Sequence, residues 1–162
     1  KRFIYDESFK TPLLIRWPNK IKAGITNDEM VQNLDFAQTF LEAAGIDAPD
    51  DMQGESLIPL LTESGEDWTR DAVYYHYYEY PSVHMVKRHY GIVNKDYKLV
   101  RFYYDVDEWE LYDRKNDPNE MNNVYNDPEY SDIVSDLKIQ LAELRKKYKD
   151  SEELDQKFIY KN

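Results

Sequence analysis

The chain has 162 residues, a formal net charge of −11 and no cysteine. Its length suffices for a domain with its own core, and a hydrophobic content of 41% argues against overall disorder. The negative charge argues against a nucleic-acid partner, because phosphate contacts require clustered Lys and Arg side chains. The lack of cysteine excludes disulfides and thiolate metal sites within the chain, and it leaves the compartment open.

From the start of the chain we expect that it continues a longer sequence. The first residue is Lys1 rather than Met, so we expect a fragment of a longer protein. No signal sequence is visible, although the missing segment could carry one. No apolar run is long enough to cross a membrane, so we expect no membrane partner.

The first third of the chain predicts one strand and one helix. An apolar run at residues 13–15 is bounded by prolines and predicts a buried strand. Asp35, with Gln38 three residues later, has the pattern of a capping box, and Gly45 ends the helix that follows. The apolar face of this helix consists of Phe36, Phe40, Leu41 and Ala44. We expect this α/β unit to pack on a larger sheet that the chain lacks.

The middle of the chain predicts an antiparallel sheet. Residues 63–69 are polar and form our expected domain boundary. Short strands are predicted at residues 72–80, 89–93, 97–104 and 109–112, because these segments are rich in Tyr and other strand-favouring residues. Turn signals at Gly91, residues 94–96 and residues 105–107 separate or interrupt them. Sequential short strands with short connections favour a meander.

The last third predicts a long helix that covers the sheet. Asp127 caps it and Pro128 takes its first position. An apolar stripe follows at helical spacing: Ile133, Leu137, Leu141, Leu144 and Tyr148. Residues 151–162 have no periodic stripe and are predicted to be a loose tail. The fold class is therefore α/β to α+β, with residues 1–68 ending a larger α/β domain, residues 69–150 forming a subdomain, and residues 151–162 as the tail.

Several motifs occur in a recognisable order. WELYD at residues 109–113 and DPNEMNN at residues 117–123 read as a strand, a turn, and a Glu and an Asn that bond to nearby backbone. Together with residues 1–18, 32–46 and 52–57, they resemble the C-terminal part of a type I sulfatase of the alkaline phosphatase superfamily, in particular the bacterial carbohydrate sulfatases. The resemblance extends to about Tyr148.

The resemblance implies an enzyme that hydrolyses sulfate esters, with a sulfated carbohydrate as its substrate. It implies that Lys1 binds the sulfate ester, where a fixed ammonium stabilises the developing anion. It also implies formylglycine, made from Cys or Ser in a C/S-x-P-x-R motif, and a divalent cation, calcium. The chain contains neither that motif nor a set of metal ligands, so both cofactors belong to a missing N-terminal sulfatase domain. The family suggests a periplasmic or secreted location.

The substrate contacts in this chain are predicted at His84, Lys87, Arg88 and His89. All three histidines lie between residues 76 and 89, among several tyrosines. Imidazoles, cations and aromatic faces together suit a sulfated sugar. The alternative is that these histidines satisfy local backbone groups, and the sequence leaves both open. Their spacing does not indicate a zinc site.

Two other functions remain open. A phosphonate monoester or phosphodiester hydrolase of the same superfamily would share this half of the fold, and the missing half would distinguish it. A non-catalytic carbohydrate-binding module would use the Tyr-rich sheet alone. The acidic residues 105–110 could suggest glycosidase carboxylates, but such a run is more often a turn or a solvated face.

Overall fold

The computed structural model describes residues 2–62 and 68–159. It divides into two compact units, one formed by residues Lys1–Thr11 with Tyr74–Asn162 and the other by Pro12–Val73. The predicted division at residues 63–69 lies mostly outside the described residues, and the domain limits stay a prediction. Among the described residues, no helix has both the length and the apolar character that a bilayer span requires.

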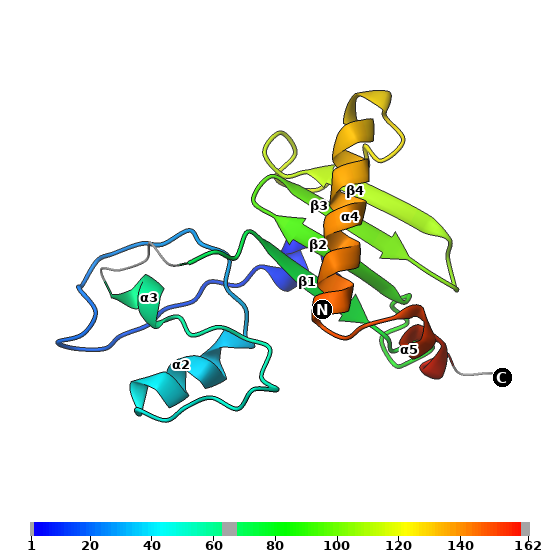
Figure 1. The fold of residues 1–162 in the computed structure, drawn as a ribbon. Coiled ribbons are helices and arrows are strands. Elements are labelled where there is room, and N and C mark those ends of the chain that lie inside the picture. The colour runs from blue at the N-terminus through cyan, green and yellow to red at the C-terminus, as the bar shows by residue number, and fades with distance from the viewer. Residues whose placement is uncertain (1, 63–67, 160–162) are drawn as a thin grey trace. The chain divides into compact units, whose positions relative to one another are not determined.

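The larger unit is built on a four-stranded meander, as the sequence predicts. Its strands are β1 (Ala72–Tyr77), β2 (His89–Asn94), β3 (Tyr97–Phe102) and β4 (Glu108–Asp113), and they lie side by side in chain order (Figure 1). β2 and β4 both pair antiparallel with β3. Asn94 fixes the β2–β3 turn, because its Oδ1 accepts bonds from the amides of Asp96 and Tyr97.

Gly91 has a different role from the predicted turn. It lies within β2 opposite Val100. A Cβ at this position would come within 2.9 Å of the Ile4 Cδ1 and 2.5 Å of the Leu99 carbonyl oxygen. Glycine therefore lets the N-terminal segment pack directly on the strand, and Ile4 is fully buried there.

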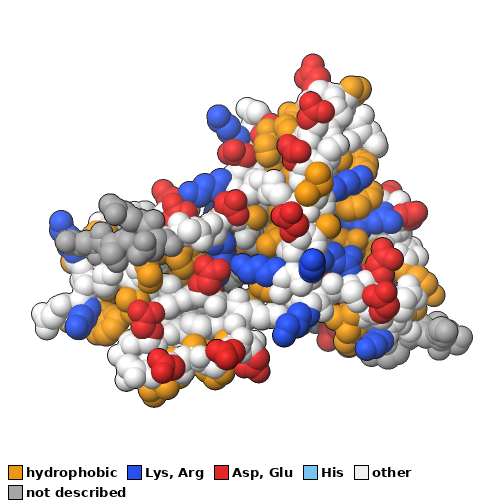
Figure 2. All heavy atoms as spheres, viewed as in Figure 1, with side chains coloured by type: hydrophobic (Ala, Val, Ile, Leu, Met, Phe, Trp, Pro, Cys, Tyr) orange, Lys and Arg blue, Asp and Glu red, His pale blue; other side chains and the backbone are white. Residues whose placement is uncertain are grey.

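The predicted long helix is also confirmed. A short helical turn, η2 (Pro128–Tyr130), leads into α4 (Ser131–Lys147), and the Asp127 side chain accepts the Glu129 amide at 3.0 Å. α4 crosses one face of the sheet and contacts β2 and β3 (Figure 1). Its outward side carries interspersed acidic and basic side chains (Figure 2). Its inward side buries Val134, Leu137 and Leu141.

We expect Leu141→Ala to lower the free energy of unfolding by about 2–5 kcal/mol, because it leaves a cavity under α4. Leu141 is only 2% exposed, whereas Ile139 on the same helix is 61% exposed. Ile139→Ala is the matched control and should change stability by less than about 0.5 kcal/mol. Urea unfolding of the chain measures both, and equal losses would contradict the predicted packing of α4.

The smaller unit contains α2 (Asp35–Ala43) and α3 (Ile58–Leu61). The capping box predicted at Asp35 and Gln38 is wrong, because α2 begins with Asp35 and has no side-chain cap bond. The Asp35 carboxylate is buried instead. It pairs with Arg70 at 2.5 and 2.8 Å and accepts the amide of Gln32 at 2.6 Å and that of Glu55 at 2.9 Å. One carboxylate thus ties three separate segments of this unit together.

Two further predictions are wrong. Residues 13–15 form no strand, and Leu14 is 94% exposed. A strand needs a neighbouring strand for its backbone bonds, and this segment finds none among the described residues. The tail is not loose throughout, because α5 (Glu152–Lys157) forms and Ser151 caps it by accepting the Leu154 amide. The pairing of Asp155 with Arg145 helps to hold α5, although the helix has no apolar stripe.

α1 (Asp6–Phe9) completes the larger unit. Although it comes from the start of the chain, it belongs with the sheet that begins more than sixty residues later. The antiparallel sheet covered by a C-terminal helix confirms the predicted α+β subdomain.

Candidate functional site

The segment between β1 and β2, which we call loop 78–87, carries two of the predicted substrate residues. His84 is exposed near its tip and Lys87 is half-buried at its end. The Lys87 ammonium donates to the Tyr80 hydroxyl and lies 3.8 Å from the centre of that ring. The loop thus displays an imidazole and a cation beside an aromatic face, a combination that suits an anionic sugar.

Arg88 follows the loop and is almost fully buried. Its Nη1 donates to both carboxylate oxygens of Asp105, at 3.0 and 2.8 Å. Its Nε donates to the Tyr78 carbonyl at 3.2 Å, and its Nη2 donates to the carbonyls of Tyr80 and Phe158. All three guanidinium nitrogens therefore bond within the chain. In this position Arg88 holds the loop backbone, and its predicted contact with the substrate stays a prediction.

His89 is also buried, at the start of β2. Its Nδ1 donates to the Lys87 carbonyl at 2.8 Å. Burial lowers the pKa of His89 to about 4, although the bond to that carbonyl acts in the opposite direction. The imidazole is therefore neutral at pH 7, and its Nε2 has no hydrogen-bond partner among the described residues. The rings around it are Phe3, Tyr75, Tyr77 and Phe102.

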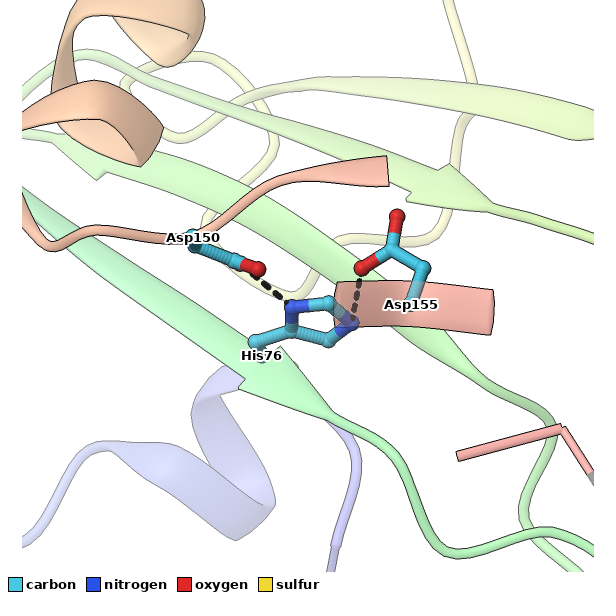
Figure 3. Close-up of side chains that lie close together, drawn as sticks. All are labelled: His76, Asp150 and Asp155. Atoms are coloured by element: carbon cyan, nitrogen blue, oxygen red, sulfur yellow. Dashed lines mark hydrogen bonds and ion pairs between the residues drawn. The ribbon is translucent and has the colours of Figure 1, made fainter. Parts of the chain in front are cut away.

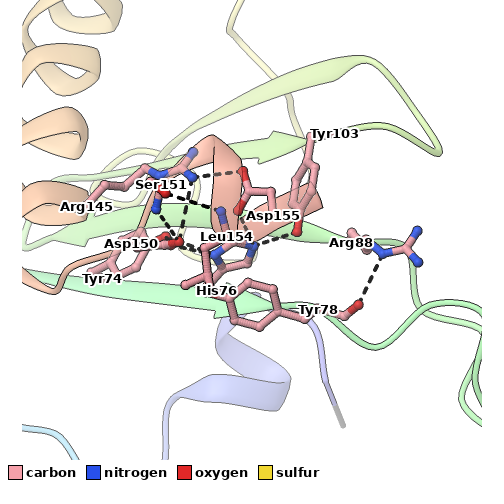
Figure 4. Close-up of polar contacts among 10 residues, drawn as sticks. All are labelled: Tyr74, His76, Tyr78, Arg88, Tyr103, Arg145, Asp150, Ser151, Leu154 and Asp155. Atoms are coloured by element: carbon pink, nitrogen blue, oxygen red, sulfur yellow. Dashed lines mark hydrogen bonds and ion pairs between the residues drawn. The ribbon is translucent and has the colours of Figure 1, made fainter. Parts of the chain in front are cut away.

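The third histidine, His76, belongs to a buried polar cluster that the sequence did not reveal. It lies in β1, and its Nδ1 is 2.6 Å from an Asp150 carboxylate oxygen. On the other side of the ring, Nε2 lies 3.7 Å from Asp155 (Figure 3). The same nitrogen lies 2.7 Å from the Tyr103 hydroxyl (Figure 4). The hydroxyl of Tyr74 also donates to Asp150. The cluster therefore joins β1 and the end of β3 to the segment around α5.

His76, Asp150 and Asp155 also satisfy the distances of a metal-binding group, since one ligand atom of each lies within 4.8 Å of the others. The family's calcium does not fit here, because it prefers about six to eight oxygen ligands. Arg145 already occupies the cluster, at 2.8 Å from Asp155 and 3.7 Å from Asp150. Its positive charge opposes a second cation, so the cluster is an ion-pair network (Figure 4).

The pKa values of the two aspartates are shifted in opposite directions in this network. Burial opposes ionisation of Asp150, but hydrogen bonds from His76 and Tyr74 outweigh it and lower its pKa to about 2. Burial raises the pKa of Asp155, and the Arg145 hydrogen bond only partly opposes it. Ionised Asp150 therefore stabilises the fold, whereas ionisation of Asp155 costs stability.

We expect Asp150→Asn to lower the free energy of unfolding at pH 7 by about 2 kcal/mol. Because the folded-state pKa is depressed, this contribution exists above about pH 4 and is lost as the pH falls toward 2. Urea unfolding of both forms between pH 7 and pH 2.5 measures the difference, with exposed Asp136→Asn as the control. A loss that does not change with pH would show that the charge is not its cause.

A second charged cluster holds the N-terminal segment to the sheet. The Lys98 side chain on β3 is fully buried and pairs with the carboxylates of Asp6, at 2.7 Å, and Glu120. Arg114 Nη2 donates to Asp6 at 3.0 Å, and the Asp6 amide donates to Glu120 at 2.9 Å. Residue 6 is thus fixed through its main chain and its side chain. Lys1 itself lies outside the described residues.

This cluster explains part of the DPNEMNN motif. Asn123 bonds to nearby backbone as predicted, because its Oδ1 accepts the amides of Leu111 and Tyr125 at 3.0 Å. Glu120 does not bond to nearby backbone, because its side chain accepts the amide of Asp6, more than one hundred residues earlier. Its positive φ of 55° turns the chain at this point.

Comparisons with known proteins agree with this fold. Residues 1–147 match the family model described as N-sulphoglucosamine sulphohydrolase, C-terminal. The chain is 52% identical over 155 residues to an N-acetylglucosamine-6-O-sulfatase of Bacteroides thetaiotaomicron, covering 94% of this chain and 28% of that protein. The solved structure of a protein in complex with its substrate, D-glucosamine-2-N,6-O-disulfate, matches with a TM-score of 0.80 and 52% identity, over 85% of this chain and 28% of that one.

A phosphonate monoester hydrolase of Agrobacterium radiobacter is less similar, at 25% identity and a TM-score of 0.56 over 70% of this chain and 24% of that one. The chain spans 28% of the length of the curated sulfatase. The family match covers nearly all of the chain, including both compact units. The chain therefore belongs to the family described as N-sulphoglucosamine sulphohydrolase, C-terminal.

Proposed function

We propose that the whole protein hydrolyses sulfate esters of carbohydrates and that this chain supplies its C-terminal subdomain. The family match over residues 1–147, with 52% identity to a sulfatase along 94% of the chain, carries this proposal. The phosphonate hydrolase alternative is less favoured, because that relative reaches only 25% identity. A binding module without catalysis is less favoured because the match extends through both units.

For the substrate, we propose a glucosamine unit with a 6-O-sulfate. A curated relative named N-acetylglucosamine-6-O-sulfatase and a solved structure in complex with D-glucosamine-2-N,6-O-disulfate, each 52% identical to this chain, support this class. Loop 78–87 offers suitable chemistry, because an exposed imidazole can bond a sugar hydroxyl and the Lys87 ammonium can meet an anionic substituent.

The residues of this chain would have three roles. Lys1 would bind the sulfate ester and stabilise its negative charge as the bond to the sugar breaks. His84 and Lys87 would contact the sugar, whereas buried Arg88 and His89 would hold these contacts in place from beneath. Formylglycine and calcium, both held by the missing domain, would supply the nucleophile and a positive charge beside the sulfate.

The test is sulfate release from D-glucosamine-2-N,6-O-disulfate by the whole protein, produced with formylglycine maturation and calcium. We expect turnover by the whole protein and none by this chain alone, because the chain has no C/S-x-P-x-R motif. A variant with the nucleophile replaced by Ala is the control for contaminating enzyme. Turnover of a phenylphosphonate ester without turnover of any sulfate ester would refute the proposal.

We expect His84→Ala in the whole protein to lower kcat/KM for the disulfated glucosamine roughly tenfold, the effect of about one lost hydrogen bond. Hydrolysis of a small aryl sulfate should be unchanged, because it makes no sugar contacts. The neighbouring Val83, which is 93% exposed, gives the matched control Val83→Ala. Equal losses on both substrates, together with a lower melting temperature, would favour a purely structural role for His84.

A further inference from the structure

Helix α5 lies outside residues 1–147, which match the family, yet its contacts converge on the base of loop 78–87. The Phe158 ring at its C-cap lies 4.7 Å from the Tyr78 ring, and Tyr78 stacks on His76 at 3.7 Å. The Phe158 carbonyl accepts the Arg88 guanidinium at 3.2 Å. The same guanidinium bonds the carbonyls of Tyr78 and Tyr80. Arg88 therefore links the C-cap of α5 to two residues at the start of the loop, Tyr78 and Tyr80.

α5 is itself fixed at its start. Ser151 Oγ accepts the Leu154 amide at 3.2 Å, and Asp155 pairs with Arg145 at 2.8 Å (Figure 4). The preceding Asp150 bonds His76 at 2.6 Å. These contacts attach the helix to α4 and to β1, the strand that precedes the loop. Movement of α5 is therefore restrained by contacts that do not involve Phe158.

The tip of the loop has little packing of its own. Val83 is 93% exposed, Met85 is 62% exposed, and His84 between them is exposed as well. The conformation of such a tip is set mainly by the contacts at its base. At that base, α5 supplies an aromatic ring and a carbonyl, as described above.

We propose that α5 is a positioning element that holds loop 78–87 in the conformation that binds the sugar, and that it thereby sets the affinity for the glycan. The inference rests on the proposed role of the loop in recognition. If the loop adopts its binding conformation one tenth as often, the apparent affinity falls about tenfold. Chemistry at the sulfate would be unaffected, because α5 acts through the loop and does not touch the reacting group.

The experiment compares three variants of the whole protein. Phe158→Ala removes the ring that packs on Tyr78, Phe158→Tyr keeps it, and Gln156→Ala changes an exposed position of the same helix. Hydrogen exchange of peptides spanning residues 78–87 reports loop order without any substrate. KM and kcat are measured on D-glucosamine-2-N,6-O-disulfate and on an aryl sulfate.

We expect Phe158→Ala to speed exchange in the loop and to raise KM for the disulfated glucosamine about tenfold, with kcat and aryl sulfate hydrolysis unchanged. Phe158→Tyr and Gln156→Ala should behave as wild type. Unchanged exchange in Phe158→Ala would overturn the positioning role, whatever the enzyme's substrate. Faster exchange without a change in KM would overturn the link to affinity. A whole protein without sulfatase activity would instead refute the proposed function, and the exchange measurement would still decide whether α5 orders the loop.

Discussion

Lys1→Ala in the whole protein is expected to lower kcat/KM for sulfate esters by roughly 10²–10³-fold, or about 3–4 kcal/mol, because one ionic donor to a developing anion is lost. The loss should be similar for the glucosamine substrate and for an aryl sulfate, since both carry the same reacting group. This result would distinguish Lys1 from the loop residues, because substitutions in the loop should affect only hydrolysis of the glycan.

The control for Lys1→Ala is Lys10→Ala. Its side chain is 74% exposed and reaches Asp6 only at 4.0 Å, so its removal should leave turnover unchanged. Circular dichroism should show the same fold for all three proteins. If Lys1→Ala keeps wild-type turnover, then Lys1 is not the lysine that binds sulfate.

The second large effect is expected at Lys98. Lys98→Met should lower the free energy of unfolding by about 3–5 kcal/mol, because it leaves the carboxylate of Glu120 buried without its cation. The side chain of Lys98 is 0% exposed and that of Glu120 is 2% exposed. Water therefore cannot replace the lost partner. Urea unfolding of the chain measures the loss.

A double-mutant cycle tests whether the loss arises from the buried, unpaired charge of Glu120. Glu120→Gln should cost far less in the Lys98→Met background than alone, because the charge that needed a partner has already lost it. Independent, additive losses would show that the two side chains do not depend on each other. Lys10→Ala again serves as the exposed control and should cost less than about 1 kcal/mol.

The sequence predicted α4 and the order of the strands, because both depend on residues that lie close together in the sequence. The stripe containing Leu137 and Leu141 specifies one face of α4, and the Asp127–Pro128 cap specifies where the helical region begins. The alternation of Tyr-rich strands and short turns predicted the order of the sheet. Each of these signals depends on residues a few positions apart, so a single sequence displays it directly.

The incorrect predictions concern segments whose structure depends on contacts with residues far away in the sequence. Asp35 resembles a helix cap, but Arg70 makes it a buried ion-pair partner instead. Residues 13–15 have the composition of a strand, but strand formation depends on a neighbouring strand, and residues 2–62 and 68–159 provide none for this segment. α5 has no apolar stripe, and its Asp155 is held by Arg145, ten residues away. A periodic pattern of apolar residues does not predict ion pairs between residues that lie far apart in the sequence.

The predicted substrate contacts stay a prediction, and the sequence could not tell which of their side chains are exposed. The cluster of histidines points to the segment after β1, but residue types do not reveal burial. Arg88 and His84 looked equivalent in the sequence, yet one is buried with all its nitrogens bonded and the other is exposed. Asp105 and Phe158, the partners that bury Arg88, are 17 and 70 positions away.

The contact between the N-terminal segment and the sheet has a consequence for synthesis. Ile4 packs beside Gly91 in β2, and Asp6 bonds Glu120, which follows β4 and is made 114 residues after Asp6. Closing so long a loop costs entropy before any contact forms. While the ribosome makes residues 12–73, the four-stranded sheet that the segment after Lys1 joins has not yet been made. The nascent chain must therefore keep this apolar and acidic segment unpaired until β4 and Glu120 have emerged.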